Sequence, residues 1–79
     1  MVVNMKRDED RKKFVGLAEK RVARALKDIK LIGNLSNRSN YSYTPADAEK
    51  IYKALKKGID EMKSRFDSSG AEADELFKL

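Results

Sequence analysis

The chain of 79 residues carries 18 lysines and arginines against 13 aspartates and glutamates, which gives a formal net charge of +5. The absence of cysteine and histidine excludes a disulfide scaffold, a zinc finger and the commonest general base at neutral pH. A composition of 41% apolar and 39% charged residues is typical of long helices and coiled coils. We therefore expect one small all-α domain, without a cofactor or a bound metal.

The first nine residues are predicted to form a flexible N-terminal arm. Their apolar opening, residues 1–5, gives way at once to charged residues. A secretory signal needs an apolar run of about 7–15 residues, and a membrane span about 20. The sequence therefore predicts a cytoplasmic protein with no membrane span.

A first helix is predicted over residues 10–32. Its apolar side chains recur at intervals of three and four, at Val15, Ala18, Val22, Ala25, Ile29 and Ile32. Phe14 and Leu26 widen this stripe. Gly33 and Asn34 follow the last apolar residue, which predicts a left-handed cap at the end of the helix.

The opposite side of this helix carries a row of basic residues: Lys13, Lys20, Arg24 and Lys27. No acidic residue of the predicted helix falls within the arc of about 60° that they occupy at 100° per residue. Such a row is suited to phosphate contacts. Leu17 and Leu31 lie within or beside the row and are candidates for contact with a protein partner. The alternative is an ordinary solvated face with two stray leucines.

The connector, residues 33–43, is rich in asparagine and serine. These residues order irregular chain through local side-chain hydrogen bonds, which is the structural interpretation. In the functional interpretation, Arg38, Tyr41 and Tyr43 bind and stack on nucleic-acid bases or phosphates.

A second helix is predicted over residues 45–66. Thr44 is a good N-cap, Pro45 fits the first helical position, and Asp47 is an acid in the first turn. Its apolar residues are spaced 3, 4, 4, 3 and 4 apart, at Ala48, Ile51, Leu55, Ile59, Met62 and Phe66.

Residues 67–79 are predicted to form an acidic tail or a short third helix. Asp67-Ser68-Ser69-Gly70 interrupts the helical pattern, and Ser69 with Glu72 resembles a capping box. Leu76 and Phe77 form an apolar patch suited to a protein partner.

The stretch from Lys20 to Phe66 resembles a family of small uncharacterised bacterial proteins that carry a Gly-Asn-Leu-Ser-Asn signature between two helices. The residues that carry the resemblance are Arg21-Val22, Ala25-Leu26-Lys27, Ile29, Ile32-Gly33-Asn34-Leu35-Ser36-Asn37, Tyr41, Tyr43-Thr44 and Ile51. It implies a bacterial, cytoplasmic protein and assigns no catalytic or binding residue.

Together the two helices predict an antiparallel hairpin domain over residues 10–66. We expect eight residues to face inward: Val15, Val22, Leu26, Ile29, Ile51, Leu55, Ile59 and Met62. Because two helices make a thin core, a homodimer in the form of a four-helix bundle is also expected.

The charge distribution favours a polyanionic partner. Residues 1–40 carry eleven bases and five acids, whereas residues 67–79 carry one base and four acids. No nucleophile and base have a recognisable spacing, so we expect no enzyme. The first interpretation is a nucleic-acid-associated accessory protein, and the second is an adaptor or inhibitor that docks on a larger protein. Peripheral membrane binding is the third, weakened by the lack of tryptophan.

Overall fold

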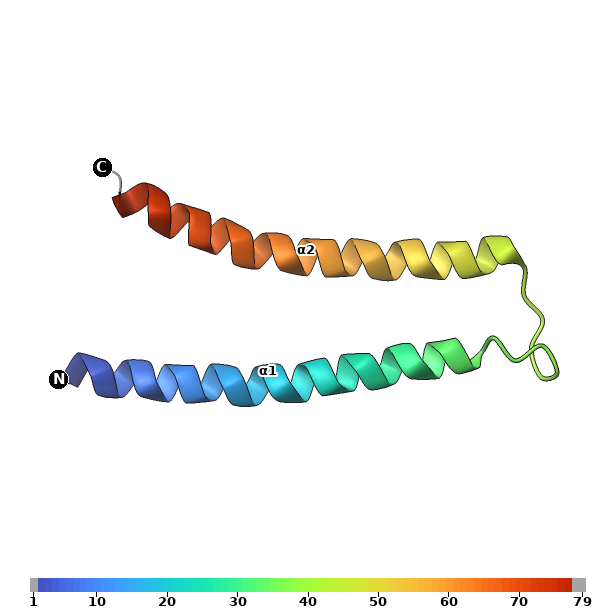
Figure 1. The fold of residues 1–79 in the computed structure, drawn as a ribbon, viewed down its shortest axis with the longest axis horizontal. Coiled ribbons are helices and arrows are strands. Elements are labelled where there is room, and N and C mark those ends of the chain that lie inside the picture. The colour runs from blue at the N-terminus through green and yellow to red at the C-terminus, as the bar shows by residue number, and fades with distance from the viewer. Residues whose placement is uncertain (1, 78–79) are drawn as a thin grey trace. The chain divides into compact units, whose positions relative to one another are not determined.

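A computed structural model of the protein describes residues 2–77, and the side chains of residues 6–69. It contains two α-helices of 33 residues each, α1 (Val2–Asn34) and α2 (Pro45–Phe77), with no strand in the described part of the chain (Figure 1). The predicted all-α class is confirmed. The chain divides into two units, Met1–Ser42 and Tyr43–Leu79, which are described separately.

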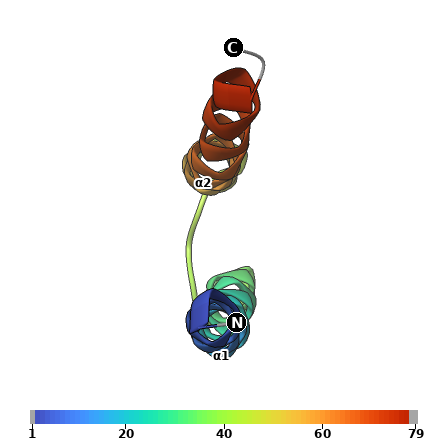
Figure 2. The ribbon, with the colours of Figure 1, turned by 90° about the vertical axis from the view of Figure 1, so that its left-hand side faces the viewer.

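Helix α1 begins earlier than predicted. Residues 2–9, expected to form an arm, are the first turns of one uninterrupted helix (Figure 1), which Figure 2 shows end-on from its N-terminal side. The segment before Gly16 contains neither glycine nor proline, and its Met, Lys, Arg and Glu residues are good helix formers. The prediction started the helix at the acidic residues because they suit a first turn, but intrinsic propensity carries the helix eight residues further.

Helix α1 ends without the predicted left-handed cap. No residue in the described part of the chain has a positive φ, and Gly33 and Asn34 are still helical. Instead, the backbone N–H of Leu35 donates to the carbonyl of Ile32, and that of Ser36 to the carbonyl of Gly33. The N···O distance is 3.0 Å in both bonds. These tight i→i+3 bonds satisfy the terminal carbonyls that a left-handed cap serves elsewhere.

Helix α2 begins where it is predicted to begin. The Thr44 hydroxyl oxygen accepts a hydrogen bond of 3.1 Å from the Asp47 backbone N–H, so Thr44 is the N-cap. Pro45 occupies the first helical position, where its missing N–H costs no hydrogen bond. The local chemistry of these three residues fixes the start of the helix.

Helix α2 continues beyond its predicted end at Phe66. It passes through Asp67-Ser68-Ser69-Gly70 and ends at Phe77, so no separate third helix begins after the serines. One glycine costs a helix only about 1 kcal/mol relative to alanine. The alanine, glutamate and leucine residues that follow are strong helix formers and outweigh that cost.

Neither helix buries any of the side chains of residues 6–69, so the predicted core is not formed by either helix alone. Among the residues whose side chains are described, none is buried. Of the eight residues expected to face inward, Val15 and Leu55 are half-buried and six are exposed: Val22, Leu26, Ile29, Ile51, Ile59 and Met62. An amphipathic helix needs a second surface to cover its stripe. The antiparallel hairpin and the four-helix bundle stay predictions.

Candidate nucleic-acid interface

The four basic residues predicted to contact phosphates lie on one side of α1. All four are exposed: Lys13, Lys20, Arg24 and Lys27. Because they belong to one continuous helix, their backbone positions are fixed relative to one another. The helical rise of about 1.5 Å per residue spreads them over about 21 Å of the helix axis.

The early start of α1 extends this row, and the sequence analysis missed the extension. Lys6 is exposed and helical, so Lys6, Lys13, Lys20 and Lys27 follow one another at intervals of seven residues. At about 1.5 Å per residue, the extended row covers about 32 Å. Glu9 also belongs to the helix. At 100° per residue it has the same angular position around the helix axis as Lys27, so one acid lies at the edge of the arc of basic residues. We call Lys6, Lys13, Lys20, Arg24 and Lys27 the basic row.

The basic row is electrostatically unbalanced. None of its members takes part in an ion pair or hydrogen bond of its side chain with another described residue. Arg24 has like-charged neighbours three or four residues away at Lys20, Arg21 and Lys27, against a single acid, Asp28. Each like-charged helical pair costs about 0.2–0.5 kcal/mol. An anionic partner along this side of α1 would relieve that repulsion.

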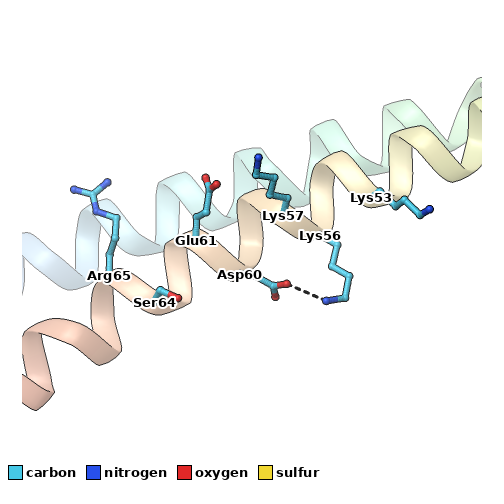
Figure 3. A pocket seen from close by; sticks show the side chains of 7 residues that line it. All are labelled: Lys53, Lys56, Lys57, Asp60, Glu61, Ser64 and Arg65. Atoms are coloured by element: carbon cyan, nitrogen blue, oxygen red, sulfur yellow. Dashed lines mark hydrogen bonds and ion pairs between the residues drawn. The ribbon is translucent and has the colours of Figure 1, made fainter.

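The charges of α2 are arranged differently. Lys56 Nζ lies 2.9 Å from Asp60 Oδ2, and Lys63 Nζ lies 2.8 Å from Asp67 Oδ2. A shallow hollow runs along this helix between cationic and anionic side chains (Figure 3), lined by Lys53, Lys56, Lys57, Asp60, Glu61, Ser64 and Arg65. Sequence reasoning did not anticipate the hollow. Its mixed charges and its position on a single helix do not suit it to a polyanion or to an enclosed ligand.

The apolar candidates beside the basic row are accessible. Leu17 is 43% exposed and Leu31 is 53% exposed, which agrees with the sequence pattern that places both away from the apolar stripe of α1. Both therefore remain suitable for a protein contact. The other two candidates, Leu76 and Phe77, lie outside the residues whose side chains are described.

Asn37 orders the connector through local hydrogen bonds, as the structural interpretation predicts. Asn37 Oδ1 accepts a hydrogen bond of 3.0 Å from the backbone N–H of Ser39, and the Asn37 carbonyl accepts from the N–H groups of Asn40 and Tyr41 at 3.1 and 3.0 Å. This is a side-chain-stabilised turn. Its bonds explain at least one asparagine without any ligand.

The three functional candidates of the connector are divided between the two units. Arg38 and Tyr41 are exposed and belong to the unit that contains α1, whereas Tyr43 is half-buried and belongs to the unit that contains α2. Arg38 and Tyr43 each take part in an interaction within the protein. Tyr41, at 49% exposure, is the better candidate for stacking on a base.

In the described part of the chain, no group of three or more acidic side chains could hold a metal ion. Neither described helix contains an apolar stretch long enough to cross a bilayer. Comparisons with protein-family models, with curated proteins and with solved structures give no significant match.

Proposed function

We propose that this chain is a small, non-enzymatic accessory protein of the bacterial cytoplasm that associates with nucleic acid through the basic row of α1. One observation carries the proposal: the row is exposed, lies on a single helix and has no ion pair with a residue whose side chain is described. Lysine and arginine side chains in a line neutralise successive phosphates and release counterions. Such contacts are independent of sequence, so the proposed association is with the backbone.

The test measures binding to duplex and single-stranded oligonucleotides by fluorescence anisotropy at several salt concentrations. The variant K20Q/R24Q removes two cations from the basic row. The matched control K53Q/K57Q makes the same change in charge and spacing on α2, where Asp60 and Glu61 lie among the lysines. Both variants have the same net charge, so a difference between them reports position rather than total charge.

We expect K20Q/R24Q to weaken binding equally across oligonucleotides of unrelated sequence. The slope of log K against log salt should become shallower by about 1.5–2 units, since each phosphate contact contributes about 0.9 to its magnitude. The control should keep most of the original slope. Equal losses in both variants, or no binding by the unmodified chain at about 100 μM and low salt, would contradict the proposal.

A protein-interaction module is the second candidate, favoured by the exposure of Leu17 and Leu31 beside the row. Two leucines next to cations are suited to an acidic protein partner with an apolar groove. Replacing both leucines with serine should leave nucleic-acid binding almost unchanged but abolish a protein contact. Loss of nucleic-acid binding in the leucine variant would instead indicate that the row and the leucines form one surface.

A further inference from the structure

Helix α2 carries an apolar stripe whose side chains are mostly exposed. The stripe comprises Ala48, Ile51, Leu55, Ile59, Met62 and Phe66, and it occupies one side of the helix. Ile51 is 41% exposed, Ile59 is 50% exposed and Phe66 is 58% exposed, while Leu55 is half-buried. An apolar stripe about 27 Å long at 1.5 Å per residue is far more than a few stray surface residues.

The spacing within this stripe differs from that of α1. Its positions repeat after eleven residues, since Ala48, Ile51 and Leu55 are followed by Ile59, Met62 and Phe66. An eleven-residue period drifts slowly in the right-handed sense around a straight helix, whereas the alternating three-four spacing of α1 drifts in the left-handed sense. Over about 18 residues the two stripes diverge by about 80°. The stripe that best matches α2 in period is therefore another copy of α2.

The order of side chains in the stripe favours an antiparallel arrangement. If two copies of α2 run in opposite directions and are centred near residue 57, Leu55 lies opposite Ile59 of the second copy and Ile51 lies opposite its Met62. The small Ala48 then lies opposite the large Phe66, so the volumes complement each other along the pair. A parallel pair would instead place alanine against alanine at one end and phenylalanine against phenylalanine at the other.

The charges beside the stripe favour the same orientation. Asp47 and Glu49 flank its beginning, whereas Lys63 and Arg65 flank its end. Antiparallel pairing places Asp47 near Arg65 of the second copy on one side. On the other side it places Glu49 near Lys63, which also holds Asp67 of its own helix at 2.8 Å. A parallel pair would bring like charges together at both ends. Arg65 has no ion pair with a described residue, so it is available for this contact.

From the shared period, the complementary volumes and the complementary charges, we propose that α2 is a self-recognition surface that pairs with α2 of a second copy in antiparallel orientation. The occupant of the stripe is the same protein. Asp47 still caps its own helix through one carboxylate oxygen, because a carboxylate has enough acceptor positions for an arginine as well.

Sedimentation equilibrium of the full chain tests the association. We expect a dimer of twice the 9.0 kDa chain mass. Leu55→Glu should weaken dimerisation at least about tenfold, because it places an unpaired carboxylate in the apolar contact. Ala23→Glu, a control at an exposed position of α1 outside its apolar stripe and outside the basic row, should leave dimerisation unchanged. A monomer at all accessible concentrations, as expected if α1 covers the stripe, overturns the proposal, and so does equal sensitivity to both substitutions.

Cross-linking tests the orientation even if Leu55→Glu does not fold. The chain has no cysteine, so single cysteines react at one position only. Mixing Ala48→Cys with Phe66→Cys chains and adding a short bismaleimide should join one copy of each. Neither variant alone should cross-link, since two identical positions are about 27 Å apart along an antiparallel pair at 1.5 Å per residue. Cross-linking of each variant with itself, and not of the mixture, would show a parallel pair and overturn the proposal.

Discussion

Thr44 and Asp47 cap each other at the start of α2. The Asp47 N–H donates to the Thr44 hydroxyl oxygen at an N···O distance of 3.1 Å. The Thr44 N–H donates to Asp47 Oδ2 at a distance of 2.9 Å. The pair is a capping box in which aspartate takes the place usually held by glutamate or glutamine. Its negative charge also lies where the helix dipole favours an anion.

Replacement of Thr44 by alanine should cost about 1 kcal/mol of unfolding free energy, because the N–H of Asp47 loses its side-chain acceptor. Chemical denaturation monitored by circular dichroism measures the loss. Thr44→Ser is the control, since it keeps the hydroxyl and should stay close to the unmodified protein. A loss below about 0.3 kcal/mol for Thr44→Ala would show that another group caps the helix.

Neutralising part of the basic row should stabilise α1 while weakening its proposed binding. In K20Q/R24Q the repulsion of Arg24 by Lys20, Arg21 and Lys27 disappears at the cost of one attraction to Asp28, for a gain of about 0.5 kcal/mol. K53Q/K57Q should change stability little. The three attractions that it removes, to Glu49, Asp60 and Glu61, are offset by the three repulsions of Lys53 with Lys50, Lys56 and Lys57. Thermal denaturation at low and high salt compares the two variants, and the gain in K20Q/R24Q should shrink at high salt. A gain of equal size in both variants would contradict this account.

Gly16→Ala should raise the helical stability of α1 by about 1 kcal/mol. Gly16 is inside the helix, and a Cβ atom at this position would meet no atom within 4 Å. The reverse change at a nearby exposed position, Ala23→Gly, should lose a similar amount. Thermal unfolding followed by circular dichroism compares the two. A destabilised Gly16→Ala variant would indicate that something packs closely against this point of α1.

Asn37→Ala should loosen the connector without unfolding either helix. The substitution removes the acceptor of the 3.0 Å hydrogen bond from the Ser39 N–H. Amide hydrogen exchange should therefore become faster at Ser39, whereas exchange in the middle of α1 and α2 should not change. Asn37→Asp keeps an acceptor oxygen and is the control. Unchanged exchange at Ser39 would mean that the bond to Asn37 does not protect this N–H, which would contradict the prediction.

The sequence was sufficient where the structure depends on neighbouring residues. The start of α2 follows from the hydroxyl of Thr44, the ring of Pro45 and the carboxylate of Asp47, all within one turn. The basic row was predictable for a similar reason, since positions on a helix follow from a rotation of 100° per residue. Lys6 was missed only because the helix was expected to start later.

The sequence was insufficient where weak preferences compete. Gly33 and Gly70 both look like helix terminators. However, Gly33 is still part of α1, and Gly70 lies inside α2. A glycine costs about 1 kcal/mol, which several good helix formers offset. The predicted burial of Val22 and Ile59 stays a prediction for a different reason: it depends on a covering surface that the pattern of one helix does not specify.

The absence of left-handed backbone at the end of α1 has a consequence for its length. A residue at positive φ would pin the helix end, because the end moves only if that residue crosses a sterically forbidden region. With Leu35 and Ser36 bonded to Ile32 and Gly33 at negative φ, the last turn winds or unwinds one residue at a time by exchanging i→i+3 for i→i+4 acceptors. The boundary of α1 is therefore adjustable, and no backbone barrier separates a longer helix from a longer connector.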